Sequence, residues 1–431
     1  MGRPPTHVVR APGRVNLLGE HTDYNGLPVL PMAIDRSIMI AVAARPDATV
    51  RLLNTSTRFT ERSYELRTPI PPFSNGDWGN YSKAAAQGLL QSCGADLRHG
   101  ADMLLDGNIP SGAGLSSSSA SVVANSLALL AANAVEVPFA TLAELLPIAE
   151  RYVGTLSGGM DQATSLLALA GHALRIDFFP LRVRTVPLPV GYSLLVCDSL
   201  VRAEKSGAAK RGYNLRVIEC RLACRVLERS LASALPRGLR TLGDLASLFP
   251  GRPLLDFLSH LIAAIPERPL SLSEIARQIG TSPERLQVEC EIPPDLGDRF
   301  ALIARVRHVL SEAERVGRAE EALRAGDAAA FAHLMDASHA SCRDDYEISC
   351  DALEEMVRIN KEAGALGARL TGAGFGGCTV SLVPDTQVTT FLRRVDRYFY
   401  RNRLADGERV SDYRFVFQPQ AGAQVIGWTS G

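Results

Sequence analysis

The chain has 431 residues, 46% of them hydrophobic, which is enough for a sizeable core in one large or two medium domains. Lysine plus arginine and aspartate plus glutamate both number 46, so the formal net charge at pH 7 is zero. A nucleic-acid surface normally carries a basic excess, so this balance argues against nucleic acid as a partner.

The cysteines and the N-terminal segment bear on the cellular compartment. Eight cysteines are scattered without a CxxC pair or a histidine pair at metal-ligand spacing, which favours reduced thiols over a zinc site or a disulfide framework. The N-terminal segment lacks the apolar stretch of a secretory signal, and no run approaches the ~20 apolar residues of a membrane span. We therefore expect a cytoplasmic protein without a membrane partner.

The first half of the chain is predicted to be rich in strands. Short β-type runs begin at residues 7, 37, 48 and 101. A helix is predicted over 121–134, and the later helical stretch LAELLPIAERYVG contains Pro147, which should start or kink it. Strand patterns follow from Gly171 and Tyr192, and the three prolines between them indicate a domain boundary near residue 190.

The second half is predicted to be richer in helix. Long amphipathic patterns cover 216–235 and 298–325, and a further helix is expected over 350–363. Two strand-like runs, ARLTG and CTVSLV, follow with a glycine-rich turn between them, and YRFVFQ is a candidate last strand. Because strands and helices mix without a regular βαβ rhythm, the pattern predicts an α+β fold rather than a Rossmann fold.

The segment 271–287 has the apolar spacing and central turn of a helix-turn-helix. One interpretation is a DNA-binding regulator, whose affinity for DNA would depend on salt. Two short packed helices in an enzyme produce the same pattern, and the zero net charge favours this second interpretation.

A polar cluster lies near the N-terminus, in APGRVNLLGEHTDYNG. Arg14, Glu20, His21 and Asp23 fall between a Pro-Gly turn and an Asn-Gly turn. Such groups can hold a polyol through bidentate and charge-assisted hydrogen bonds. The alternative is a solvated loop with incidental charges.

The stretch PSGAGLSSSSA, residues 110–120, leads directly into a predicted helix. Glycines let the backbone approach a ligand, and the first helical turn offers unpaired N–H groups and the positive end of the macrodipole. Together these make an anion cradle, most often for phosphate, beside which serine hydroxyls can cap the helix or reach Mg²⁺. The stretch is neither a Walker A loop nor a Rossmann fingerprint, and an ordinary serine-capped helix is the alternative.

Two further motifs carry candidate chemistry. SGGMDQ offers Asp161 as a base or a charge stabiliser, although an aspartate that caps the following helix would look the same. LTGAGFGGCTVSLV has four glycines in six residues between two strand runs, which allows a tight turn and a close approach to another backbone. A glycine-rich hairpin without a ligand is the alternative for this second motif.

Together these segments resemble the GHMP kinase superfamily and, within it, the galactokinase family. GRVNLLGEHTDYNG is similar to the galactokinase signature, GAGLSSSSA to the ATP-phosphate loop of the family, and LTGAGFGGC to the motif that supports this loop. SGGMDQ matches the segment with the catalytic aspartate, and the segments that begin at Trp78 and Gly212 also match. The resemblance runs in order from about residue 8 to residue 400, which is nearly the whole chain.

The resemblance implies an α+β, two-domain GHMP kinase with the active site between the domains. The N-terminal domain, residues 1–190, would resemble domain 2 of ribosomal protein S5 and would carry the sugar and ATP-phosphate motifs. The C-terminal domain, residues 191–431, would be ferredoxin-like, with a helical insertion over about 225–300.

The resemblance also implies transfer of the γ-phosphoryl group of ATP to the anomeric hydroxyl of a sugar. Asp161 would accept or orient the proton of the C1 hydroxyl, and Arg14 would keep this carboxylate ionised and offset developing charge. The other implied ligands are Glu20, His21, Asp23, Gly158, Gly159 and Tyr213 for the sugar, Gly112, Ala113, Gly114, Leu115, Ser116, Ser117 and Ser118 for the phosphates, and Ser118 and Glu150 for Mg²⁺. Four consecutive serines leave the register of the Mg²⁺ ligand open by one residue.

Departures from the common pattern bear on the substrate. SSSSA, the helix-rich stretch 225–300 and HASCRDDYEISC resemble the branch that includes N-acetylgalactosamine kinase and fungal galactokinases, whereas GEHTDYNG and Tyr213 are similar to the common galactose enzymes. We expect galactose as the substrate, with N-acetylgalactosamine as the alternative. A non-catalytic sensor of sugar and ATP is an alternative of another class, against which the intact loop, Arg14 and Asp161 argue. The sequence leaves the oligomeric state open, and a monomer is favoured.

Overall fold

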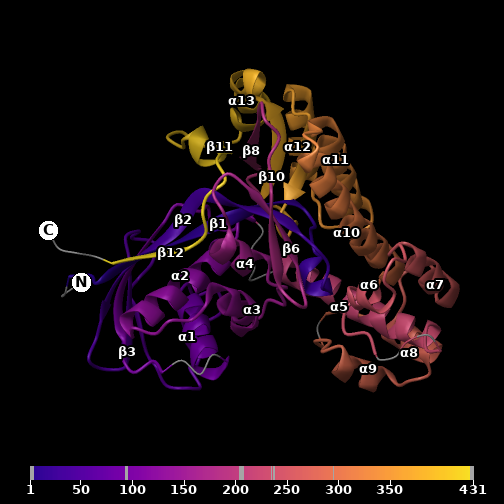
Figure 1. Ribbon diagram of the computed structural model, residues 1–431, viewed down its shortest axis with the longest axis horizontal. Coiled ribbons are helices and arrows are strands. Elements are labelled where there is room, and N and C mark those ends of the chain that lie inside the picture. The colour runs from indigo at the N-terminus through magenta and orange to yellow at the C-terminus, as the bar shows by residue number, and fades with distance from the viewer. Residues whose placement is uncertain are drawn as a thin grey trace.

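The computed structural model describes residues 4–92, 96–202, 208–233, 235, 238–294 and 296–427. A six-stranded sheet with its helices makes up one side of the molecule, a four-stranded sheet with long helices rises from it, and a helical lobe projects beside them (Figure 1). Strands and helices are mixed as expected, so the predicted α+β class is confirmed.

The six-stranded sheet has the order β12-β1-β2-β5-β3-β4, in which only the β3–β5 pair is parallel. Its strands are β1 His7–Leu18, β2 Leu30–Ala44, β3 Thr49–Asn54, β4 Arg62–Glu65, β5 Ala101–Gly107 and β12 Gln424–Gly427. The last described residues thus pair with the first strand, and Figure 1 shows β12 crossing back to β1.

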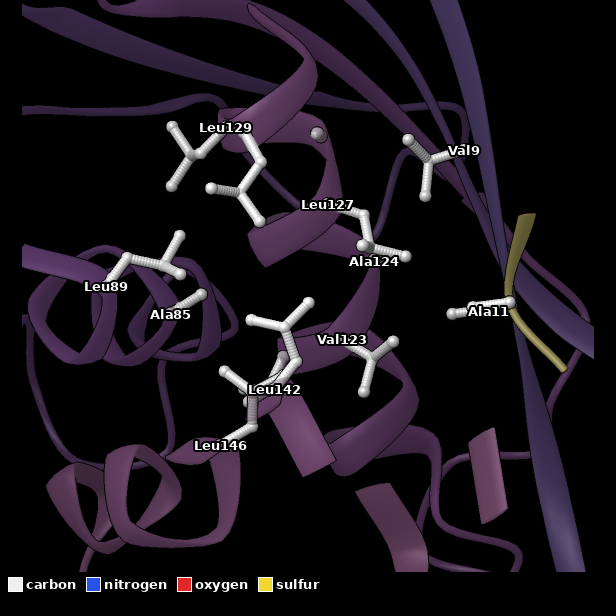
Figure 2. Packing of buried hydrophobic residues seen from close by; sticks show 14 of the residues in the cluster. Val9, Ala11, Ala85, Leu89, Val123, Ala124, Leu127, Leu129, Leu142 and Leu146 are labelled. Atoms are coloured by element: carbon white, nitrogen blue, oxygen red, sulfur yellow. The ribbon is translucent and has the colours of Figure 1, made fainter. Parts of the chain in front are cut away.

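The helices of this half are α1 Asn80–Ser92, α2 Ser117–Ala132, α3 Phe139–Glu150 and α4 Met160–Leu167. Helix α2 is buried on nearly all sides because it packs against the sheet and is itself covered by α1. Figure 2 shows Val123 and Ala124 of α2 facing the strand that carries Ala11, with Leu142 of α3 close by. Pro147 lies inside α3, so it does not start that helix as one of the two expectations had it.

The four-stranded sheet has the order β11-β8-β10-β9, and all its pairs are antiparallel. Its elements are β8 Tyr192–Asp198, β9 Gly367–Thr371, β10 Cys378–Pro384 and β11 Arg414–Phe417, with the helices α10 Leu302–Arg324, α11 Ala328–Asp344, α12 Asp351–Ala363 and α13 Val388–Val395. A short hairpin of β6 Ala173–Asp177 and β7 Arg182–Val186 precedes it, so the predicted boundary near residue 190 falls between β7 and β8.

The helical lobe consists of α5 Ala208–Ser230, α6 Asp244–Leu248, α7 Asp256–Ala264, α8 Leu272–Ile279 and α9 Pro283–Glu289. Helices α8 and α9 are the predicted helix-turn-helix segment, and serines at 271 and 282 cap them. Their apolar residues Ile275 and Leu286 are fully buried in the core of the lobe. Packing within the lobe therefore accounts for this pattern.

Single-turn elements complete the described secondary structure: 3₁₀ turns at Asp23–Asn25, Arg151–Val153, Asp385–Gln387 and Val410–Asp412, and a π-helical turn at Asp396–Tyr400. The seven described cysteines are all free thiols. Among the described helices, none has the length and apolar character that crossing a bilayer requires.

The packing of α3 predicts how two substitutions on that helix will differ. Leu142 is fully buried, whereas Ile148 is 57% exposed. Because a truncated core leucine loses its transfer free energy and leaves a cavity, Leu142→Ala should lower the free energy of unfolding by about 2–5 kcal/mol. Ile148→Ala is the matched control and should change it by less than about 0.5 kcal/mol. Urea unfolding followed by circular dichroism measures both, and equal losses would contradict the described packing of α3.

Candidate active site

A cavity of about 560 Å³ opens where the four sequence motifs meet. Of the predicted site residues, it is lined by Arg14, Glu20, His21, Asp23, Gly112, Gly114, Ser116, Ser117, Ser118, Gly159, Asp161 and Tyr213. The others lie just behind its wall: Ala113 and Leu115 are buried in the core, Glu150 is fully buried, and Gly158 packs against Asp23. The structure therefore brings the separate motifs to one place.

Arg14 of β1 connects two of these motifs. Its Nε donates to Asp161 Oδ1 at 2.8 Å, and its Nη2 lies 2.6 Å from the same oxygen. Its Nη1 donates to the carbonyl oxygen of Gly114 at 2.7 Å. Both side chains of the ion pair are largely buried, at 5% exposure for Arg14 and 14% for Asp161. Asp161 is thus held in the first turn of α4 and beside the loop of residues 110–120, which we call the phosphate loop.

The backbone of the phosphate loop is in the left-handed region at three positions, Gly112, Gly114 and Ser116. Alternating conformations of this kind turn successive N–H groups toward one concave side, which suits an anion. Ser116 precedes α2, yet its hydroxyl makes no capping hydrogen bond and is buried without a partner among the described residues. The ordinary serine-capped helix is therefore not what the structure shows at Ser116.

The glycine-rich hairpin between β9 and β10 packs backbone to backbone on this loop. A Cβ atom on Gly372 would lie 2.4 Å from the carbonyl oxygen of Gly114, and one on Gly377 would lie 2.8 Å from that of Ala113. Only glycine fits at such distances, and both residues also have positive φ. The hairpin supports the phosphate loop from behind.

The side chain of Asp23 is buried, and this residue lines the cavity together with Asp161. Burial raises the pKa of Asp23 to about 6, and the negative charge of Asp161 adds to this shift. The backbone N–H of Met160 donates to Asp23 Oδ2 at 3.3 Å. Gly158 allows this approach, because a Cβ atom there would lie 2.5 Å from Asp23 Cγ.

His21 and Tyr213 form an aromatic wall of the cavity. The His21 ring donates from Nε2 to the carbonyl oxygen of Ala373 at 3.1 Å and accepts at Nδ1 from the Tyr24 hydroxyl at 3.0 Å. Burial lowers the pKa of His21 to about 3, so the ring is neutral. Tyr213 of α5 lies 5.0 Å from this ring between centroids, and burial raises the pKa of its phenol, which stays a neutral donor.

Glu20 links the loop that follows β1 and carries Glu20, His21 and Asp23, which we call the polar loop, to the C-terminal half of the chain. Its Oε1 accepts from the backbone N–H of Gly372 at 2.9 Å and from the Arg369 guanidinium at 3.2 Å. Both side chains are buried, and burial raises the pKa of Glu20 against the lowering effect of the Arg369 charge. Glu20 therefore has a structural contact as well as a place in the cavity wall.

Two residues of α10 fix the same loop from the other side, and the sequence motifs did not point to them. Glu312 accepts from the backbone N–H of Gly19 at 2.8 Å, and His308 Nε2 lies 3.1 Å from the carbonyl oxygen of Glu20. Burial alone would raise the pKa of Glu312, but the charges of Arg315 and Arg369 hold it well below the usual range. His308 and Glu312 lie on the buried face of a long amphipathic helix. Their spacing in the sequence is therefore the same as that of residues that only pack in the core.

A cluster of oxygen atoms could hold a divalent cation next to the phosphate loop. Ser119 Oγ donates to Glu150 Oε2 at 2.7 Å and lies 3.3 Å from Asp161 Oδ2, and Gln162 also contacts Glu150. Ser118, the predicted ligand, lines the cavity one residue earlier. Hydroxyl and carboxylate oxygens suit Mg²⁺. Within the described ranges no group of three or more histidine, cysteine or acidic side chains could hold a metal. An ion here would therefore also need phosphate oxygens from a nucleotide.

The cavity has further lining residues that the sequence did not single out. Phe73, Tyr81 and Tyr152 give part of the wall an aromatic character. Thr155 and Ser157 also line it, and their hydroxyls are buried without a hydrogen-bond partner in the described part of the chain. Of these residues only Tyr81 lies in the family-like segment that begins at Trp78, and nothing in the sequence pattern distinguished the others.

Comparison with known protein families supports the interpretation of the motifs. Residues 1–44 match the galactokinase galactose-binding signature, residues 80–168 match the N-terminal domain of GHMP kinases, and residues 319–401 match their C-terminal domain. The fold is the two-domain GHMP kinase fold.

Individual relatives align over most of the chain. A galactokinase of Dictyostelium discoideum is 34% identical over 99% of this chain and 92% of its own length, and one of Chloroflexus aggregans is 38% identical over 91% and 87%. The crystal structure of Lactococcus lactis galactokinase complexed with galactose is similar at a TM-score of 0.74 and 27% identity, covering 97% of this chain and 94% of that one. A mevalonate kinase at 17% identity and a TM-score of 0.56 shares the fold. Because the curated relatives span nearly the whole chain at this level of identity, the protein belongs to the galactokinase family of GHMP kinases.

Proposed function

We propose that this protein transfers the γ-phosphoryl group of ATP to the C1 hydroxyl of α-D-galactose. The observation that carries the proposal is the Arg14 guanidinium, which contacts both Asp161 and the carbonyl of Gly114 in the phosphate loop. A carboxylate and a phosphate cradle are thereby held within the reach of one side chain, as an in-line transfer requires. The likeness to a galactokinase structure that contains galactose supports the choice of sugar.

In this proposal Asp161 accepts or orients the proton of the C1 hydroxyl while the hydroxyl oxygen attacks the γ-phosphorus. Arg14 keeps the carboxylate ionised by its direct ion pair, and its positive charge offsets the charge that develops on the phosphoryl oxygens. ADP leaves from the opposite side of the phosphorus. Because the groups are already placed, most of the rate gain comes from orientation and electrostatics.

The sugar would be bound by the polar loop and by the aromatic wall that His21 and Tyr213 form. Asp23 offers a carboxylate acceptor, Tyr213 a neutral hydroxyl donor, and Glu20 and His21 complete the lining together with the backbone at Gly158 and Gly159. The unpartnered hydroxyls of Thr155 and Ser157 are further candidates for sugar or nucleotide contacts.

ATP would be bound as its Mg²⁺ complex. The backbone over 112–118 and the free hydroxyl of Ser116 would take the phosphates, and the aromatic wall of Phe73, Tyr81 and Tyr152 would take the base. Mg²⁺ would be held by Glu150 and by Ser118, or by Ser119, which contacts Glu150 directly. The ion would neutralise charge on the β- and γ-phosphates.

The cytoplasmic location, the monomeric state and the absence of nucleic-acid and membrane partners stay predictions. The alternatives of N-acetylgalactosamine as substrate and of a non-catalytic sensor are outcomes of the experiment that follows.

A coupled assay of ADP release tests the proposal directly. With MgATP we expect turnover of galactose at a higher kcat/KM than of N-acetylgalactosamine, glucose, galacturonate or arabinose. If N-acetylgalactosamine leads, the fold and the chemistry stand but the substrate is wrong. If sugar and ATP bind without any turnover, the protein is a sensor and the proposed activity fails.

Substitution of the proposed base separates chemistry from binding. Asp161→Asn removes the acceptor of the hydroxyl proton but keeps the shape, so kcat should fall by about 10²–10⁴-fold. The dissociation constant of galactose, measured by calorimetry, should change by only a few fold. Asp256→Asn in the helical lobe is the control, because that carboxylate is half exposed and far from the motifs along the chain. A variant of Asp161 that keeps wild-type kcat would rule out this residue as the base.

The buried carboxylate of Asp23 predicts opposite effects on stability and on sugar binding. Its pKa is about 6 in the fold against an ordinary value of 3.8, so the folded state binds more protons and the ionised form costs stability as the pH rises through this range. A difference of two units corresponds to about 3 kcal/mol. Asp23→Asn should therefore raise the thermal midpoint at pH 7.5, with no gain below about pH 4, while the KM for galactose increases.

Thermal unfolding in a series of buffers from pH 4 to 8 measures the stability part of this prediction. Asp102→Asn is a suitable control, since Asp102 is buried but pairs with Arg45 instead of facing another carboxylate. If Asp23→Asn is less stable than the wild type at pH 7.5, desolvation of this carboxylate does not dominate its energetics.

A further inference from the structure

A second cavity of about 220 Å³ lies behind the wall of the proposed sugar site. It is enclosed by the turn that carries Tyr24, the loop before α4, one side of α5 and the turn around Arg240. Gly158 lines this second cavity, and its backbone packs directly on Asp23, which lines the first one. Gly158 and Asp23 therefore form part of the wall between the two cavities.

The charge of the second cavity is positive. Arg151, Arg221 and Arg240 line it, and no aspartate or glutamate is among its lining residues. Arg221 pairs with Glu291 at 2.7 Å, whereas neither Arg151 nor Arg240 has a carboxylate partner in the ranges that the structure describes. Both of these side chains are exposed at the rim.

The other polar residues of this cavity carry no negative charge. Ser157 lines both cavities, and its hydroxyl is buried without a partner among the described atoms. The Cys220 thiol is neutral, because burial raises its pKa to about 11. Asp244, an acidic residue beside the cavity, is used elsewhere, since it accepts from the backbone N–H groups of Arg240 and Thr241 at 2.8 and 3.1 Å. Cationic side chains and an unsatisfied hydroxyl, with no carboxylate among the lining residues, favour a small anion.

We propose that this second cavity binds a phosphate group, either free or as a small phosphate ester. Guanidinium groups recognise phosphate oxygens through charge-assisted hydrogen bonds, and the Ser157 hydroxyl supplies a donor at the inner wall. The volume is below the 300–1,000 Å³ range of sites for drug-sized ligands, and it suits phosphate or a phosphorylated sugar better than a nucleotide.

An anion here would act on the sugar site through the shared wall. It would place a negative charge behind Gly158 and Asp23, and so disfavour the ionised carboxylate of Asp23. The second cavity also contacts Tyr24, whose hydroxyl donates to the His21 ring. Phosphate should therefore weaken sugar binding, and sugar should weaken phosphate binding by the same factor. This coupling rests on the proposed function, whereas the binding of phosphate does not.

Calorimetric titration of the full chain with inorganic phosphate tests the site itself. Titrations with and without galactose and a non-hydrolysable magnesium–ATP analogue separate the two cavities, because the analogue fills the phosphate loop. We expect one phosphate equivalent that remains with the analogue bound, and a loss of about tenfold or more in its affinity in the double variant Arg151→Gln and Arg240→Gln. Arg229→Gln, an arginine in the last turn of α5 outside both cavities, is the matched control.

The outcomes decide the proposal in either direction. No phosphate binding, binding that the analogue abolishes, or equal affinity in the double variant and the wild type would overturn the second site. A parallel titration with α-D-galactose 1-phosphate distinguishes the sources, since tighter binding of the ester than of inorganic phosphate points to the product of the proposed reaction.

Steady-state kinetics then test the coupling. Added phosphate should raise the KM for galactose in the wild type and in Arg229→Gln but not in the double variant. A phosphate effect that persists unchanged in the double variant arises in the main cavity and contradicts the coupling. Failure of the proposed activity would appear separately, as no turnover in the wild type before any phosphate is added.

Discussion

The Arg14 guanidinium is the contact on which the site depends. It is planar and donates in two directions, so one side chain reaches a carboxylate on α4 and a backbone carbonyl in the phosphate loop. Both members of the ion pair are withdrawn from solvent, and removing either one would leave a buried charge uncompensated. The first strand, the loop before α2 and the start of α4 therefore keep a fixed geometry relative to one another.

A second set of contacts gives the N-terminal polar loop its position by reaching across the molecule. Glu312 and His308 bind backbone groups of Gly19 and Glu20, and Arg369 binds the side chain of Glu20. These are buried polar interactions, so their value lies in specifying one arrangement of the loop more than in adding stability. This loop is thus positioned by helix α10, nearly three hundred residues away along the chain, and by Arg369 of strand β9.

Much of the site could be predicted because its chemistry is carried by short, contiguous motifs. Arg14, Asp161 and the loop 110–120 were singled out within short motifs, and the resemblance to the galactokinase family implied their roles; the structure brings them to one cavity. Glu312 and His308 could not be found in this way, because polar residues on the buried face of an amphipathic helix have no local signature. The contact of Ser119 with Glu150 depends on how the first turn of α2 is oriented, which a run of identical serines does not reveal.

The elements themselves were predicted best where periodicity is strong. The strands from Tyr192 and Cys378 and the helix α12 agree closely with their patterns. Helix α5 begins at residue 208, eight residues before the predicted start, because its first turns face the cavity and carry mixed side chains such as Lys210 and Tyr213. Strand β12 was missed since all four of its residues are exposed and show no alternation of buried and exposed positions.

The pairing of β12 with β1 bears on how this chain folds during translation. Within the described residues, the outer edge of β1 pairs with residues 424–427, which follow every strand of the four-stranded sheet along the chain. Until they emerge, the nascent N-terminal half presents an unpaired strand edge, the kind of surface that recruits other strands or a chaperone. The edge of the six-stranded sheet is consequently paired only after the strands of the four-stranded sheet have been translated. The two parts of this enzyme therefore cannot complete their folding one after the other as independent units.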